Sequence, residues 1–145
     1  MVKQGIDKQE LLEEHQHVLG LTDINLEIPK GSLQVVMGLS GSGKSTLIRH
    51  INRLIEPTAG EIWVGSDDVL KMDKVQLREF RRHRTAMVFQ RFALLPHRTV
   101  LENVSYGLDI QGIAKAEAHQ RAERWIERVG LAGYENHFPA KLSGG

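Results

Sequence analysis

The sequence contains no cysteine, and only 6% of its residues are aromatic. The missing cysteine excludes disulfides and cysteine-based metal sites, and it is compatible with a reducing cytoplasm. No apolar run approaches the length that a membrane-spanning helix needs. The first residues hold no apolar segment resembling a secretory signal. We therefore expect the chain to stay on the side of the membrane where it is made, and any link to a membrane to come through a partner.

An excess of charge of either sign is also missing. The 145 residues include 19 Lys and Arg against 18 Asp and Glu, which leaves a net charge of +1. Bulk charge therefore gives no reason to expect a nucleic-acid partner. One local group of arginines stands out, but such a run on a helix is usually a solvated face. Its members are Arg78, Arg81, Arg82 and Arg84. The seven histidines show no metal-ligand spacing.

Residues 38–45 have the glycine, lysine and hydroxyl spacing of a phosphate-binding P-loop. Glycines let the backbone turn tightly and bring successive N–H groups close to phosphate oxygens, forming an anion nest. Lys44 adds a positive charge for the terminal phosphates of ATP, and the Ser45 hydroxyl is placed to ligate Mg²⁺. The predicted cofactor-binding residues of this loop are Gly38, Ser40, Gly41, Ser42, Gly43, Lys44, Ser45 and Thr46.

The segments around this loop favour a real nucleotide site. Residues 33–37 form a short, nearly continuous apolar run that is typical of a buried parallel strand. After the loop, apolar residues fall at helical spacing as far as Ile55, which predicts a helix beginning at Lys44. The positive N-terminus of that helix would face the phosphates.

The rest of the first 90 residues predicts a mixed α/β pattern. Alternation over 24–28 indicates a strand with one wet face, expected on an antiparallel edge, and 62–64 indicates a short strand. Residues 76–84 predict a basic helix. A second apolar run over 85–89 ends at the polar Gln90, and ligands gather at such strand ends in open α/β sheets.

The last third of the chain predicts a helical subdomain. Thr99 and Glu102 have the spacing of a capping box, and a stripe of apolar residues at helical spacing ends at Gly130. We expect the stripe, including its tryptophan, to be core. Its members are Ala118, Ala122, Trp125, Ile126 and Val129.

Three separated signals occur in a fixed order: the P-loop, Gln90 at a strand end, and Leu142-Ser143-Gly144-Gly145. The chain thereby resembles the ATP-binding subunit of ABC transporters. The resemblance implies that Gln90 lies on the loop that touches Mg²⁺ and the attacking water, as metal-binding and catalytic-loop residue. It also implies that residues 142–145 begin the signature sequence, where a hydroxyl and bare N–H groups could cradle a γ-phosphate.

Several runs narrow the resemblance to bacterial glycine betaine/proline uptake importers. They are 38–46, 52–58, 86–90 and 92–97. The segment from Gly5 to Glu14, where Asp7 and Glu10 form another capping box, is similar to an extra helix of this quaternary-amine branch. The implied function is ATP-driven uptake of osmoprotectants, on an α/β P-loop NTPase fold with an antiparallel β edge and a helical subdomain.

The same resemblance implies a set of partners. A second ATP-binding subunit would pair head to tail, so that each ATP lies between one P-loop and the other signature. An integral membrane permease would carry the substrate, supplied by a periplasmic or lipid-anchored substrate-binding protein. The chain would then sit at the cytoplasmic face of the bacterial inner membrane. His97 could face the permease, though loop exposure accounts for it equally well.

Departures from the family pattern predict an incomplete domain. The Walker B aspartate, the catalytic glutamate and the switch histidine follow the signature in the family, and none occurs before Gly145. No aromatic residue precedes Trp63 to stack on adenine, although His15 or His17 could stack weakly. We expect 1–145 to be a partial domain, with 18–90 in the nucleotide-binding core and 91–145 as the helical subdomain.

Such a fragment should be inactive alone, and its exposed apolar edges should make it prone to aggregate. Two other functions stay open at this stage. One is an ABC ATPase that drives a soluble machine, for example in repair or translation. The other is a module that binds nucleotide without hydrolysing it.

Overall fold

The computed structural model describes residues 13, 16, 19–89 and 93–142. The chain divides into two compact units, Met1–Met72 and Asp73–Gly145. The helix expected within 5–14 falls almost wholly outside the described residues, as do Gln90 and the stretch 143–145. In the part that is described, no helix combines the length and apolar character needed to cross a membrane.

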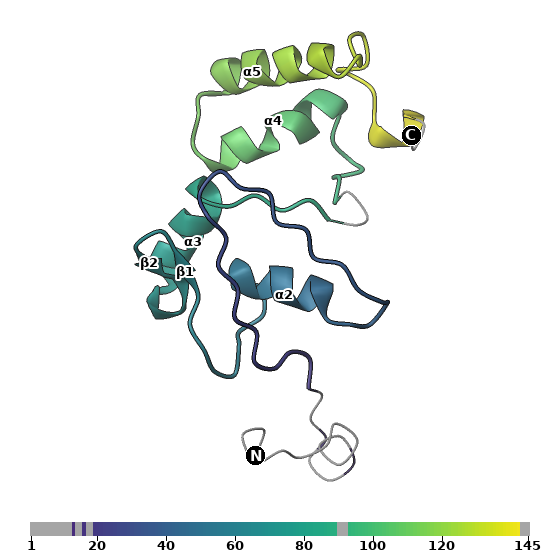
Figure 1. Ribbon diagram of the computed structural model, residues 1–145. Coiled ribbons are helices and arrows are strands. Elements are labelled where there is room, and N and C mark those ends of the chain that lie inside the picture. The colour runs from purple at the N-terminus through teal and green to yellow at the C-terminus, as the bar shows by residue number, and fades with distance from the viewer. Residues whose placement is uncertain (1–12, 14–15, 17–18, 90–92, 143–145) are drawn as a thin grey trace. The chain divides into compact units, whose positions relative to one another are not determined.

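Within residues 19–72, the first unit contains one α-helix and one small sheet (Figure 1). Helix α2 (Lys44–Ile51) begins at the expected lysine. Strands β1 (Trp63–Val64) and β2 (Asp67–Asp68) pair antiparallel, with Trp63 opposite Asp68. The 3₁₀ helix η2 (Val69–Lys71) follows, capped by the Asp68 carboxylate, which accepts the Leu70 N–H at 3.1 Å. The strand expected at 62–64 is therefore confirmed.

The strands expected at 24–28, 33–37 and 85–89 do not form in the described residues, and those expectations were wrong. The antiparallel pair lies at β1 and β2 instead of at 24–28. An apolar segment forms a β-strand only when a neighbouring segment pairs with its backbone N–H and C=O groups. Leu33 and Val88 are each 91% exposed, so these apolar runs are left uncovered.

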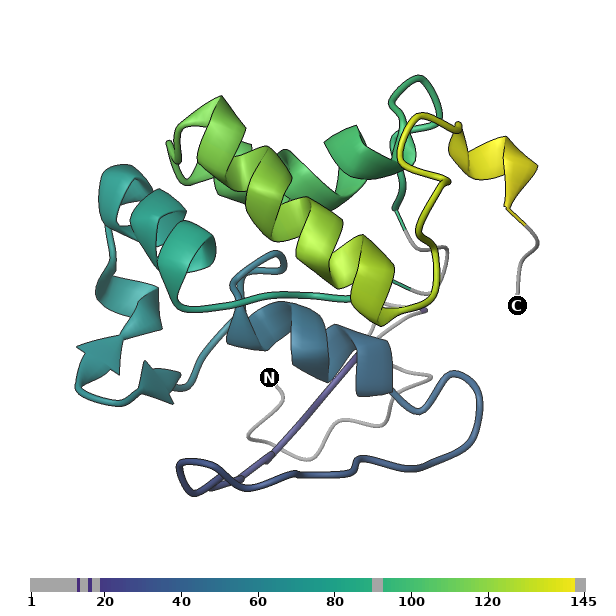
Figure 2. The same ribbon diagram turned by 90° about the horizontal axis from the view of Figure 1, so that it is seen from above.

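The second unit consists of helices α3 (Lys74–His83), α4 (Val100–Ile110) and α5 (Lys115–Arg128), followed by the 3₁₀ helix η3 (Pro139–Lys141). Helices α4 and α5 lie side by side and pack on each other (Figures 1 and 2). The buried side chains of these two helices are Val100, Ser105, Ala118, Ala122 and Ile126. Small alanines four residues apart let the two backbones come close.

The expected apolar stripe of α5 is confirmed in part. Residues 118, 122 and 126 are buried, but Trp125 is 55% exposed and Val129 is 64% exposed. The expectation that Trp125 belongs to the core was wrong. The buried residues of α5 are spaced four apart, at 118, 122 and 126, and Trp125 lies beside this row. Its indole instead lies under the Arg128 guanidinium, 5.2 Å from the ring centroid.

Local capping explains where helices α3 and α4 begin. Asp73 and Gln76 form a capping box that starts α3 two residues before the expected boundary. The predicted box at α4 is confirmed: the Glu102 N–H donates to Thr99 Oγ1, and the Thr99 N–H donates to the Glu102 carboxylate. That second bond is the main reason why the pKa of Glu102 is lowered.

The caps give a stability prediction in two directions. Thr99→Ala removes the α4 cap and should lower the free energy of unfolding by about 1 kcal/mol. The N-cap residue of α5 is Ala114, which makes no side-chain cap bond, so Ala114→Ser should raise the free energy of unfolding by about 0.5 kcal/mol. Urea unfolding followed by circular dichroism measures both, with Thr99→Ser as the control that keeps the hydroxyl. Equal stability of Thr99→Ala and Thr99→Ser would contradict the assignment.

The uncovered apolar runs predict self-association of the 145-residue chain. Light scattering after gel filtration should show mixed, concentration-dependent species. Replacing the exposed Leu33 and Val88 by lysine should reduce this association and leave the helical signal unchanged, whereas Lys30→Gln in a neighbouring turn should not. A monodisperse sample with one cooperative melting transition would show that the runs are covered after all.

Candidate nucleotide-binding site

The loop ahead of α2 has a backbone that only glycine adopts easily. Gly41 and Gly43 have φ values of 78° and 92°, in the left-handed region. A Cβ on Gly43 would also lie 2.7 Å from Leu21 Cδ2 and 3.0 Å from the Gly20 carbonyl oxygen. At Gly41 nothing lies within 4 Å of such a Cβ. Glycine at 43 is thus required twice, by torsion and by space, whereas at 41 the torsion alone requires it.

Lys44 folds back over this loop. Its ammonium donates to the carbonyl oxygens of Gly38 and Leu39, at 2.8 and 2.6 Å, and to Ser42 Oγ at 3.2 Å. An ammonium has three N–H donors, so these contacts match its full capacity. The positive charge is therefore held within the bend of the loop, where it can meet an incoming phosphate.

The N-terminus of α2 opens onto the same loop. Its N-cap residue is Gly43, which has no side chain to cap the first N–H groups, and no acidic residue lies in the first turn. The helix dipole and these N–H groups favour an anion there. Ser45 lies in this turn and is exposed, and Thr46 beside it is half-buried. The loop, the lysine and the helix end together form a coherent anion site.

The other predicted site residues are placed differently. The expectations for Gln90 and for Ser143 to Gly145 lie outside the described residues, so their approach to the P-loop stays a prediction. Leu142 caps the end of η3 and is half-buried. His97 is exposed. Among the described residues, no group of three or more His, Asp or Glu could hold a metal ion, and a Mg²⁺ site at Ser45 and Gln90 also stays a prediction.

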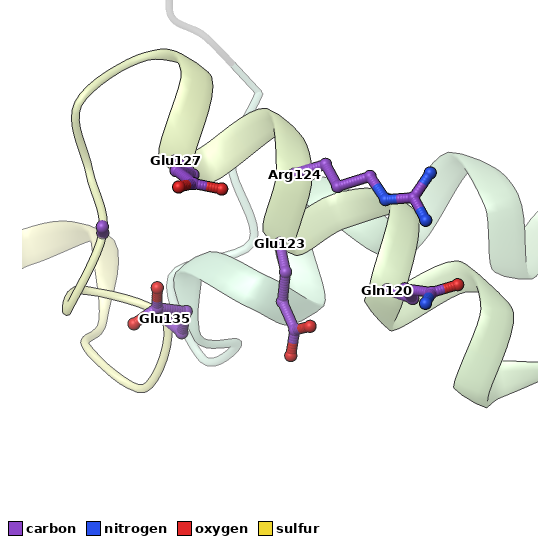
Figure 3. Close-up of a pocket in the computed structure, with 6 residues that line it drawn as sticks. Gln120, Glu123, Arg124, Glu127 and Glu135 are labelled. Carbon is purple, nitrogen blue, oxygen red and sulfur yellow. The ribbon is translucent and has the colours of Figure 1, made fainter.

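A shallow open hollow in the second unit includes none of the predicted site residues. It has a volume of about 390 Å³ and is lined by Gln120, Glu123, Arg124, Glu127, Ala132 and Glu135. Figure 3 shows the side chains of Glu123, Glu127 and Glu135 around the hollow, with the Arg124 side chain extending away from them. Hydrogen bonds from its own N–H and from the Gly133 N–H lower the pKa of Glu135. The hollow has no feature of a phosphate site.

Arg53 is a structural anchor of the P-loop helix that sequence reasoning did not single out. Just beyond the end of α2, its backbone is left-handed at φ 52°. The guanidinium pairs with Glu56 at 2.7 Å and donates to the carbonyl oxygens of Val69 and Met72, at 3.2 and 2.7 Å. The pairing with Glu56 raises the pKa of Arg53. The end of α2 is thereby tied to η2, and no local pattern signals this because the acceptors are backbone carbonyls far along the chain.

Comparison with known proteins supports the family resemblance. The sequence profile described as "ABC transporter" matches residues 21–145. The glycine betaine transport ATP-binding protein OpuAA of Bacillus subtilis (strain 168) is 50% identical over 145 residues, which is 100% of this chain and 35% of that protein. The glycine betaine/proline betaine transport system ATP-binding protein ProV of Escherichia coli (strain K12) is 46% identical over 99% of this chain and 36% of its own length.

The fold has a solved counterpart. The ATP-binding cassette MJ0796, in a dimeric post-hydrolysis state bound to ADP and phosphate, matches with a TM-score of 0.77 and 36% identity, covering 86% of this chain and 56% of that one. The P-loop NTPase fold expected from the sequence is confirmed at the level of this cassette. The chain spans about a third of the length of the curated relatives named above. Since the matching profile extends over most of its residues, the chain belongs to the ABC transporter family.

Proposed function

We propose that the chain is the ATP-binding part of the ATPase subunit of a bacterial importer for glycine betaine and proline-type osmoprotectants. The observation that carries nucleotide binding is the Lys44 ammonium, held by three hydrogen bonds inside a glycine loop at a helix N-terminus. A loop of this shape concentrates N–H groups and one positive charge where a polyphosphate would lie. The family supplies ATP as the nucleotide.

The roles of the other residues follow from their chemistry. The backbone of residues 38–46 would cradle the phosphates, and Ser45 with Gln90 would hold Mg²⁺, which neutralises phosphate charge. Ser143, Gly144 and Gly145 would close on the ATP of a second subunit. The chemistry is phosphoryl transfer to water, helped by positioning and charge stabilisation more than by covalent catalysis.

The extent of the matches supports the osmoprotectant branch. Glycine betaine relatives align over 99 to 100% of this chain. The trimethylamine N-oxide and methionine relatives are 46 to 48% identical but align over only 88 to 90%. The longer match agrees with the extra N-terminal segment that the sequence suggested. Identity alone does not separate these branches, whereas coverage does.

The partners are proposed from the same family. A second ATP-binding subunit is supported by the two matched MJ0796 structures, which are both described as dimeric. The importer relatives support an integral membrane permease and a periplasmic or lipid-anchored substrate-binding protein acting through it. The subunit would then lie at the cytoplasmic face of the inner membrane, held there by the permease.

Lys44→Ala tests nucleotide binding. Removal of a charge-assisted contact to phosphate is worth about 1.5 to 3 kcal/mol, so the Kd for ATP should rise about tenfold to a hundredfold. Fluorescent ATP titration of the full-length subunit measures this.

Lys30→Ala is the matched control, because it removes an exposed lysine from a nearby turn outside the loop. It should leave the Kd unchanged. If Lys44→Ala bound ATP as tightly as the unchanged protein, the proposed site would be wrong.

We predict hydrolysis for a subunit of the length of the glycine betaine relatives, and no phosphate release from residues 1–145 alone, which span about a third of that length. Phosphate release should be measurable only from the longer chain, and Gln90→Ala there should slow it at least tenfold.

Co-purification of the subunit with a membrane permease separates an importer from a soluble ABC ATPase. Phosphate release by neither chain would leave the nucleotide-binding module as the correct assignment.

A further inference from the structure

One side chain organises the loop that follows Gln90 in sequence. Asn103, the fourth residue of α4 at the end of its first turn, accepts the Leu95 N–H on its Oδ1 at 2.8 Å. Its Nδ2 lies 3.0, 3.1 and 2.9 Å from the carbonyl oxygens of Leu95, Arg98 and Thr99, which share the two N–H donors of the amide. The loop from 95 to 99 is thus wrapped around a single amide group.

The first turn of α4 makes a second connection. The Val100 N–H donates to the His137 carbonyl at 2.8 Å, and the Leu101 N–H donates to the Glu135 carbonyl at 3.0 Å. N–H groups at these positions have no partner within the helix itself. Backbone from a segment some 35 residues further along the chain therefore completes the start of α4.

That segment leads directly toward the signature sequence. The His137 N–H donates to the Tyr134 carbonyl at 2.9 Å, and the Leu142 N–H donates to the Pro139 carbonyl at 3.0 Å. The Gly133 N–H also donates to the Glu135 carboxylate at 3.0 Å. These two turns follow one another along the chain, and together they lead from the segment bonded to the start of α4 to Leu142, the residue before Ser143.

We propose that Asn103 is a positioning residue that joins the loop after Gln90 to the segment before Ser143, through the N-terminus of α4. The inference rests on the proposed function, because it assumes that both segments flank parts of the ATP site. A displacement of the 95–99 loop is transmitted to 135–137 because both are bonded to the same helical turn. Asn103 acts through these segments and touches no substrate.

The chemistry of an amide fits this role. Asparagine offers an acceptor and two donors on a short, stiff stem. An aspartate of the same size would keep the bond to the Leu95 N–H but would turn a carboxylate oxygen toward three carbonyl oxygens. The loop has one further support, since the Arg98 guanidinium lies 4.9 Å from the centroid of the Tyr106 ring, also on α4.

Asn103→Ala in the full-length subunit tests the proposal. Hydrogen exchange of the Leu95, Val100 and Leu101 amides should become at least roughly tenfold faster, the factor that corresponds to about 1.4 kcal/mol. The maximal rate of ATP hydrolysis should fall about tenfold, a loss of similar size. The Kd for ATP should change less than about twofold, because the P-loop lies in the other unit. A merely destabilised protein would lose affinity and rate together.

Gln111→Ala is the matched control. Its amide also donates to a backbone carbonyl, that of Arg82 at 2.8 Å, but at the opposite end of α4. It should alter neither the three amides nor the hydrolysis rate. If it altered them as strongly as Asn103→Ala, the effect would come from the helix as a whole and the proposal would be wrong.

Asn103→Asp decides the matter if the alanine variant does not fold. It keeps the acceptor for Leu95 and should still speed exchange at Val100 and Leu101. Unchanged protection of those two amides, or an unchanged hydrolysis rate despite faster exchange, would overturn the proposal. The exchange measurement is independent of nucleotide, so a failure of ATP binding in the Lys44 experiment would count against the proposed function and not against this hydrogen-bonded link.

Discussion

The backbone shape at Gly41 and Gly43 is the constraint on which the nucleotide site depends. Both residues are left-handed, and at Gly43 the neighbouring Gly20 and Leu21 leave no space for a side chain. This geometry turns the chain so that Lys44 can reach back to the carbonyls of the loop. It also leaves α2 with a glycine at its start. The positive charge and the uncapped helix end are consequences of that one turn.

Features that depend on neighbouring residues, including the short strand near 62–64, could be predicted from the sequence, whereas pairing between distant segments could not. The start of α2 and the Thr99 box were predicted correctly because each depends on residues within about one helical turn. The strands expected at 24–28 and 33–37 failed because pairing depends on a distant neighbour, which no local pattern supplies. The expectation for Trp125 was wrong for a related reason. Helical spacing identifies the apolar face of α5, but it does not tell which residues on that face pack on α4.

The candidate site shows the same division. The P-loop follows from residue spacing, because the hydrogen bonds of Lys44 all reach residues within six positions of it. Arg53 and Asn103 were missed because their partners are mainly backbone carbonyls. Every residue has such a group, so the sequence does not mark which ones act as acceptors. Arg53 reaches across 16 and 19 residues. Such anchors become visible only when the chain is folded, although both stabilise segments next to residues that the motifs had already marked.

A ligand that binds Lys44 must replace hydrogen bonds that the lysine already makes. Its ammonium already has three oxygen partners inside the loop, so an arriving molecule must replace neutral acceptors with stronger ones. Charged phosphate oxygens do so with a gain, since bonds to ionised acceptors are roughly twice as strong as neutral ones. An uncharged nucleoside would break these contacts without offering the ammonium a charged oxygen in their place. The hydrogen bonds of Lys44 therefore favour ligands that carry negative charge, whatever their base or sugar.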